Sequence, residues 1–449
     1  MTERGRLHRD PALVLLLATL AAQPFARPAL GMVGATPILL VDVAVGGTYV
    51  AVALGWLTGR LRPRPDGLLW AGMAFVAALG LSILAAGDIE LSSLVKLVAF
   101  AAYILLPWVA AQVLRDRERV EWAVRAWLAG LLVAVAVGLA GIVAFVVDRD
   151  ALTSLGCVYG RLPEGPYPRV CIPFRNPNLF ANYLAAGIGI LLASGRVLLP
   201  RRAHVVAVAA CALVAASTLS TGIGGFALSA GLTMWFTRRD RPGARPWPAL
   251  ALTASVLVAT AFALATVGHT VPPGRGQVPL ADADWHFLKG PRVHTWLSVV
   301  ATVRGHPVTG LGYGSLVARN PGRDLGPWLR ADVGKPLREG ALPRVAEAHN
   351  AWLSVAGQSG LVGLAAFVAL LVVVARRMSL RPLPVPGPLA GLPPALVAGA
   401  VGALLFHGMF AGAEEARHLW ALFALAAASN ALRARVTGRD AIPGTTPAS

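Results

Sequence analysis

A histidine stands where one long apolar run begins. His349-Asn350-Ala351-Trp352-Leu353 continues through Gln358-Ser359-Gly360-Leu361-Val362-Gly363. A histidine side chain exchanges protons near neutral pH, so at the outer mouth of a membrane span it suits a general base. The alternative is an interfacial histidine that only anchors the end of the helix. His349 is therefore a candidate catalytic residue, and Asn350 beside it is a candidate substrate ligand.

An arginine and a glycine-rich stretch precede this histidine. Gly290-Pro291-Arg292-Val293-His294-Thr295-Trp296 leads into His306-Pro307-Val308-Thr309-Gly310-Leu311-Gly312-Tyr313-Gly314. Glycine permits close backbone approach, and the planar guanidinium of Arg292 matches a phosphate. The alternative is that one arginine among many serves only solubility. Arg292 is the second candidate catalytic residue, and Gly312 is a candidate ligand of the substrate.

Two asparagines flank a proline at the start of another apolar run, in Arg169-Val170-Cys171-Ile172-Pro173-Phe174-Arg175-Asn176-Pro177-Asn178-Leu179-Phe180-Ala181-Asn182-Tyr183-Leu184. The free amides of a helix N-terminus attract anions, and arginines beside it strengthen that attraction. Arg169, Arg175, Asn176 and Asn178 are therefore candidates for binding a diphosphate. The alternative is an ordinary asparagine cap.

A metal site and the cysteines give weaker signals. Asp282-Ala283-Asp284 has the D-x-D form that holds Mg²⁺ or Mn²⁺ in many soluble glycosyltransferases, but no neighbouring strand pattern supports it. His286 and His294 show no zinc spacing, and we expect no metal and no other cofactor. Cys157 and Cys171 share one loop and are either a disulfide or two free thiols. Cys211 lies inside an apolar run, where packing explains it.

The composition indicates that these candidate residues belong to a membrane protein. Of the 449 residues, 56% are hydrophobic and 14% charged, whereas soluble domains are about 25% charged. Such a chain cannot cover a soluble globule with polar surface, and it is too hydrophobic for disorder. The net charge of +18 comes mainly from arginines between apolar runs. This is the pattern that orients membrane proteins, so we expect no nucleic-acid partner.

The apolar runs predict an all-α polytopic membrane protein of about twelve spans, because a span needs about 20 mainly apolar residues. The spans lie near 11–27, 37–58, 67–86, 91–113, 121–147, 177–199, 203–219, 221–237, 247–268, 350–375, 389–411 and 416–432. With the N-terminus in the cytoplasm, arginine clusters fall on every inner loop, while the short outer turns are bare or acidic. Both termini are then cytoplasmic. Lys96 and Arg125 near span ends are interpreted as snorkelling side chains, and His407 within a span is expected to face a polar cavity or a hydrogen-bond partner.

The chain divides at one large outer segment. Residues 1–268 carry spans one to nine, with an outer loop at 148–176. Residues 269–348 form the large outer loop, with short helices such as one near 292–304. Residues 349–435 carry spans ten to twelve, and 436–449 form a cytoplasmic tail. The chain has no internal repeat and no GxxxxGK[ST] loop, so ATP does not drive it.

The three stretches together resemble the O-antigen ligase family, which includes O-antigen polymerases and bacterial O-linked protein oligosaccharyltransferases. The resemblance rests on N-P-N-L-F-A-N-Y-L, on HPVTGLGYG after Arg292, and on H-N-A-W-L followed by G-Q-S-G-L-V-G. It implies a GT-C-like glycosyltransferase of the bacterial inner membrane with its site on the periplasmic face. There it would transfer a glycan from undecaprenyl diphosphate to lipid A–core, with His349 and Arg292 as functional residues. One departure is that the family commonly has a Ser-Arg pair where this chain has Ser220-Thr221-Gly222. Either Arg169 or Arg175 replaces that arginine, or the chain represents a divergent subgroup.

Other functions stay open. An O-antigen or exopolysaccharide polymerase would use the same donor with a second lipid-linked glycan as acceptor, and a protein oligosaccharyltransferase would glycosylate a protein. A secondary transporter or flippase is a different class. Paired halves and matching broken helices would indicate a transporter, and the sequence lacks them.

Overall fold

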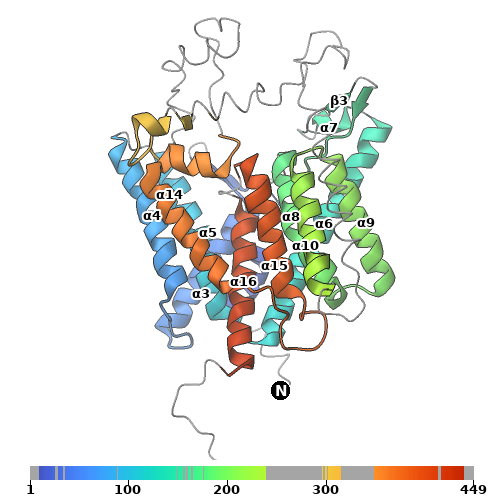
Figure 1. Cartoon of the computed structure of the whole chain (residues 1–449), viewed down its shortest axis with the longest axis horizontal. Helices are drawn as coiled ribbons and strands as arrows, with labels where there is room; N and C mark the ends of the chain where they lie inside the picture. The colour runs from blue at the N-terminus through green and yellow to red at the C-terminus, as the bar shows by residue number, and fades with distance from the viewer. Residues whose placement is uncertain are drawn as a thin grey trace, which may run out of the picture.

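The computed structural model describes residues 10–25, 29–33, 36–87, 89, 91–148, 150–154, 157, 160–162, 165–174, 176–238, 296, 299–300, 302–314, 348–412 and 416–438. Within these ranges the chain is a bundle of long helices (Figure 1). The helices of the first half are α2 (Pro11–Ala21), α3 (Leu40–Leu57), α4 (Gly67–Ala85), α5 (Leu91–Val113), α6 (Arg117–Val147), α7 (Ala151–Ser154) and α8 (Pro177–Ser194). The others are α9 (Arg201–Ser217), α10 (Gly222–Arg238), α14 (Ala351–Arg377), α15 (Leu392–Ala400) and α16 (Arg417–Val436), with short turns at η1 (Gly195–Val197), η5 (Val401–Phe406) and η6 (His407–Met409).

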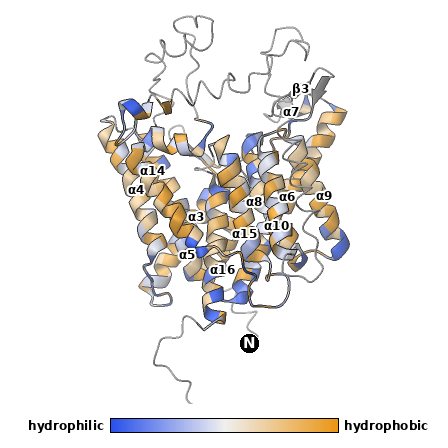
Figure 2. Cartoon of the chain, viewed as in Figure 1, coloured by the Kyte–Doolittle hydropathy of each residue, from blue (hydrophilic) through white to orange (hydrophobic). Residues whose placement is uncertain are grey.

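Apart from the four-residue α7, these helices overlap the predicted spans, although α2 is shorter than the predicted 11–27 run. The predicted span 247–268 lies outside the described residues. By length and composition, seven helical segments there could cross a membrane, namely Leu40–Leu57, Gly67–Ala85, Leu91–Val113, Arg117–Val147, Pro177–Val197, Ala351–Arg377 and Leu392–Met409. Apolar residues fill the middle of the helices, and hydrophilic residues gather mostly at their ends (Figure 2). The chain is a polytopic helical membrane protein, whereas twelve spans and a GT-C-like fold remain predictions.

Two short antiparallel hairpins depart from the predicted all-α fold. One pairs β1 (Gly31–Val33) with β2 (Thr36–Ile38), and the other pairs β3 (Gly160–Leu162) with β4 (Gly165–Tyr167). In the first hairpin, Val33 opposes Thr36 and Gly31 opposes Ile38. β-branched residues favour extended backbone, and these stretches are too short for a helix that spans a membrane. The predicted 37–58 span accordingly begins at Leu40.

Two predicted spans are interrupted helices. The run at 389–411 contains α15, then the π-helical turn η5, then the 3-10 turn η6. The run at 350–375 is α14, whose backbone leaves the helical region at Gly360. Changes from α-helix to π-helix often occur at functional sites. Both interruptions lie in the half of the run that was predicted to be the outer half.

The loops that the arginine count assigned to one side meet at one end of the bundle. Arg119 pairs with Asp10 at 2.8 Å, and Arg377 pairs with Asp66 at 3.1 Å. Arg435 donates to the carbonyl of Arg115. Partial burial and the nearby Arg435, Arg119 and Arg64 lower the pKa of Arg115. These contacts place the predicted inner loops together, as the alternation of spans requires.

Candidate functional site

The start of α14 holds His349 in a constrained position. Its backbone has φ 48°, in the left-handed region that only glycine adopts readily. Asn350 follows as the N-cap, where its Oδ1 accepts from the amide of Leu353 at 3.0 Å and its Nδ2 donates to the carbonyl of Met409 at 3.1 Å. Strained backbone persists only where its surroundings hold it. Asn350 therefore holds the neighbouring His349 close to Met409, the last residue of η6.

The glycine-rich stretch docks into the break in α14. Leu311 and Gly312 donate their amides to the carbonyls of Gly357 and Gln358, each at 3.0 Å. In return, the amide of Leu361 donates to the carbonyl of Pro307 at 2.8 Å. Backbone groups left free by the broken helix are thus satisfied, as buried polar groups must be. The structure joins two motifs about 50 residues apart, and this explains why both carry glycine.

The end of this stretch is clamped by α4 and α5. The amide of Tyr313 donates to Ser82 Oγ at 2.9 Å, and its ring stacks on Phe100 at 5.9 Å. Lys96 Nζ lies 5.2 Å from the centre of the same ring. Lys96 was predicted to be a snorkelling side chain, and in the structure it contacts Tyr313. The loop that leads from Arg292 toward His349 is thus fixed at Gly312 and Tyr313.

The start of α8 contains the predicted anion seat. Asn176 caps the helix, with its Oδ1 accepting from the amide of Asn178 at 2.8 Å. Asn178 Oδ1 accepts from the hydroxyl of Ser220 at 2.7 Å. Asn176 is therefore an ordinary helix cap. The side-chain oxygen of Asn178 is already bonded, so its side-chain nitrogen is the group that can donate to a ligand. The residue after Arg169 is held at the end of α9, because the amide of Val170 donates to the carbonyl of Ser217 at 3.2 Å.

A disulfide ties down the loop in front of α8. Cys157 and Cys171 are bonded, which confirms the disulfide over the two free thiols. Cys211 is buried and free, as expected for packing. Beyond Cys171, the ring of Phe174 stacks on Phe180, 5.5 Å away. The segment that follows Arg169 is thus bonded to Cys157 through Cys171 and packed on α8 through Phe174.

A buried polar cluster that was not predicted from the sequence lies one helical turn from Asn178. Asn182 Nδ2 donates to the carbonyl of Ala403 at 2.7 Å and meets His407 Nδ1 at 2.8 Å. Asn182 Oδ1 meets His418 Nε2 at 2.6 Å. The three side chains come from α8, η6 and α16 and are at most 2% exposed. His407 was expected to have a polar cavity or a partner, and its partner is Asn182.

Arg417, at the start of α16, is an arginine that was not predicted as a site residue. Arg417 on α16 pairs with Asp42 on α3 at 3.3 Å, and Tyr103 on α5 donates to Asp42 at 2.6 Å. Arg125, by contrast, pairs with Glu121 on its own helix at 2.5 Å. The Asp42 contacts join three helices, so this arginine has a structural partner.

The predicted site residues fall into two groups. His349 and Asn350 stand at the start of α14, and Gly312 bonds the carbonyl of Gln358 farther along that helix. Asn176 and Asn178 stand at the start of α8, and Arg169 precedes them in the chain. Arg292 and Arg175 lie outside the described residues, as do Asp282, Asp284, His286 and His294.

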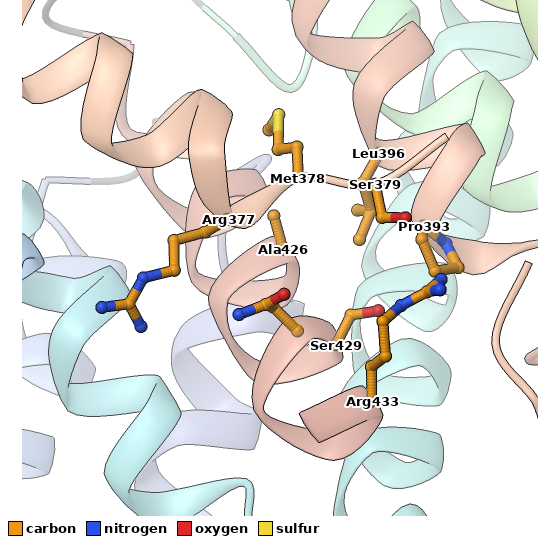
Figure 3. Close-up of a pocket in the computed structure, with 9 residues that line it drawn as sticks. Arg377, Met378, Ser379, Pro393, Leu396, Ala426, Ser429 and Arg433 are labelled. Atoms are coloured by element: carbon orange, nitrogen blue, oxygen red, sulfur yellow. The ribbon is translucent and has the colours of Figure 1, made fainter. Parts of the chain in front are cut away.

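A small pocket lies elsewhere. Its volume is about 10 Å³, which holds about one water molecule. Its lining comes from α15, α16 and the end of α14 (Figure 3), namely Arg377, Met378, Ser379, Pro393, Leu396, Ala426, Ser429, Asn430 and Arg433. Arg377 ends the 27-residue helix that begins beside His349, so the pocket is roughly 40 Å from the histidine. It is not the site of the predicted chemistry.

Comparisons with known proteins agree with the motifs. A sequence model of the family described as O-Antigen ligase matches residues 204–368, which include α9, α10 and the first two-thirds of α14. No curated protein matches the chain. The match contains the Gly310–Gly314 stretch, His349 and the Gly360 break. The match supports the O-antigen ligase family, and with it an O-antigen ligase- or polymerase-type membrane glycosyltransferase.

Proposed function

We propose that the protein transfers O-antigen glycan from undecaprenyl diphosphate to lipid A–core at the periplasmic face of the bacterial inner membrane. In this proposal both termini are cytoplasmic. The observation that carries it is the joint between the two motifs at the start of α14. There the Pro307–Gly312 backbone fills the break at Gly360, about three helical turns from a histidine held in left-handed backbone. A site of this kind presents one titratable group at a fixed place.

The donor determines what the residues must do. A lipid diphosphate leaves as a stable anion, so the reaction needs no nucleotide, and the protein must bind that anion and stabilise its developing charge. Arginine does this without a metal in a partly dry site. We assign this role to Arg292, with Arg169, Arg175, Asn176 and Asn178 as further diphosphate ligands. Asn350 and Gly312 would bind substrate through the same first turns of α14.

His349 would act on the acceptor. As a neutral imidazole it takes the proton from the acceptor hydroxyl while that oxygen attacks the anomeric carbon. The bond from that carbon to the diphosphate breaks in the same step, and this single displacement inverts the configuration.

The test is transfer by purified protein in detergent. Undecaprenyl-diphosphate glycan is offered alone and then with lipid A–core, without nucleotide or metal. We expect glycan on lipid A–core, and we expect His349→Ala to abolish it while the protein stays folded. His204→Ala is the matched control, because His204 Nε2 donates to the carbonyl of Leu191 at 2.9 Å at the other end of α8.

Each other result selects another function. Longer lipid-linked glycan from the donor alone identifies a polymerase, and glycan on an added protein identifies an oligosaccharyltransferase. Donor that crosses a vesicle membrane without transfer identifies a flippase. A His349→Ala variant with full transfer activity removes the histidine from the mechanism. A pH–rate profile that loses its limb near neutrality in the His349 variant supports the base.

A further inference from the structure

The Asn182 cluster has a single consistent hydrogen-bond arrangement. The carbonyl of Ala403 can only accept, so the atom 2.7 Å from it must be the amide nitrogen of Asn182. The same nitrogen faces His407 Nδ1 at 2.8 Å, so this ring nitrogen accepts and carries no proton. Asn182 Oδ1 then accepts from His418 Nε2 at 2.6 Å. Every atom of the amide is used, which orients both rings.

This cluster lies between the two groups of predicted site residues. On one side, Asn178 is one helical turn from Asn182 on the same face of α8. On the other side, His407 begins the 3-10 turn η6, and Met409 ends it. The carbonyl of Met409 accepts from Asn350 Nδ2 at 3.1 Å, and Asn350 is bonded in sequence to His349. Two hydrogen bonds and one turn of helix therefore connect the seat on α8 to the histidine.

Packing leaves the cluster little freedom. A side-chain carbon at Gly222, the first residue of α10, would lie 3.1 Å from His407 Cε1. The ring of His418 meets the edges of Phe174 and Tyr183, with centroids 6.0 and 5.5 Å away. Closely packed interiors respond to a change by shifting as units. A change at Asn182 or His407 is therefore passed to η6.

We propose that Asn182 and His407 are positioning residues that set the placement of His349 relative to the diphosphate seat on α8. This proposal rests on the proposed transfer reaction. Neither residue touches the reacting atoms. Their role is to hold two halves of one site, formed by α8 and by α14, at the separation that the donor and acceptor require.

Three variants and a control test this role by kinetics. Asn182→Ala and His407→Leu remove the bond, whereas His407→Asn keeps an acceptor oxygen at the place of Nδ1. Ser194→Ala is the matched control, because Ser194 is buried on the same helix and donates to the carbonyl of Pro388 at 2.9 Å. A misplacement of about 1 Å costs about 10²-fold in rate. We expect that loss in kcat for the first two variants, unchanged KM for the donor, and near-normal rates for His407→Asn and Ser194→Ala.

A distance measurement tests the same role without activity. Spin labels at Leu213→Cys on α9, which packs on α8, and at Leu361→Cys on α14 occupy positions 55% and 53% exposed. The distance distribution should broaden in Asn182→Ala and His407→Leu and stay narrow in His407→Asn and Ser194→Ala. If wild-type protein transfers no glycan to any acceptor, the proposed reaction fails while this measurement still decides the positioning.

Two results overturn the proposal. Equal loss of transfer in His407→Asn and His407→Leu would make the ring itself necessary, beyond its acceptor. A narrow, unchanged distance distribution in Asn182→Ala would show that the cluster does not hold α8 and α14 together.

Discussion

Replacing Gly360 by alanine tests whether the joint between the motifs matters. Gly360 has φ 66° and ψ −168°, a region that is essentially restricted to glycine and costs another residue about 1–3 kcal/mol. A side-chain carbon there would also overlap the carbonyl of Val308. The overlap adds to the strain, so we use the upper value of about 3 kcal/mol. At 1.4 kcal/mol for each tenfold change, the docked joint becomes about 10²-fold less populated relative to the open one.

Two assays report the joint separately from global stability. Hydrogen exchange at the amides of Leu311 and Gly312, which donate into the break, should speed up by about the same 10²-fold, because exchange follows local opening. Glycan transfer should fall wherever the open joint predominates. Gly46→Ala is the matched control, because a side-chain carbon at Gly46 on α3 meets nothing within 4 Å and alanine favours a helix.

The reasoning fails if Gly360→Ala exchanges and transfers like the wild type. It also fails if Gly46→Ala and Gly360→Ala lose activity equally, since the loss would then come from replacing any glycine in a helix. A Gly360→Ala protein that unfolds is distinguished by thermal denaturation. In that case Gly310→Ala, at φ 65° on the opposite side of the joint, repeats the test.

The other predictions concern the remaining contacts. Cys157→Ser/Cys171→Ser should lower stability by about 3 kcal/mol, because the bond closes a loop with a sequence separation of 14; thermal unfolding that is unchanged by the substitutions or by reductant contradicts this. Asp42→Asn should lower Tm, because it weakens contacts with Arg417 and Tyr103 by about 1–3 kcal/mol. Glu121→Gln, on a half-exposed pair within one helix, should cost about 0.5 kcal/mol or less. Arg169→Gln should raise the KM for donor with little change in kcat, and an unchanged KM would remove Arg169 from the seat. Transfer should be unaffected by EDTA, and its loss with recovery on added Mg²⁺ would require a metal.

The sequence predicts the helices well because a membrane span is defined by local quantities. Length and hydropathy suffice for a run such as 91–113, which matches α5 at both ends. The arginine clusters also predict which loops share an end, and Arg377 and Asp66 meet there. The sequence does not predict the break in α14, since the run reads as continuous and the backbone that fills the break comes from Pro307–Gly312. The glycines of both motifs indicate that two backbones approach closely, but they do not predict which residues of the two motifs pair.

The candidate site was predicted as residues rather than as an arrangement. His349 was found because a histidine at a span end is chemically distinct. His418 was missed because it follows Arg417 at the start of a helix, where a polar residue normally meets solvent; in the structure it is 2% exposed. Asn350 was predicted as a ligand from its place beside His349, and both groups of its side chain bond to protein. Its role as a ligand stays a prediction, whereas its contact with Met409 is part of the structure.

The missing arginine of the Ser-Arg pair has a physical explanation in the turn between α9 and α10. Ser220 donates to Asn178, Thr221 is 1% exposed, and a side-chain carbon at Gly222 would overlap Ala181. A guanidinium at position 221 or 222 would have to be buried there, and an unpaired buried charge costs several kcal/mol. The positive charge that a diphosphate needs must therefore come from another segment. Val170 is held next to this turn by its bond to Ser217, and we propose that the neighbouring Arg169 supplies this charge from the surface of the bundle.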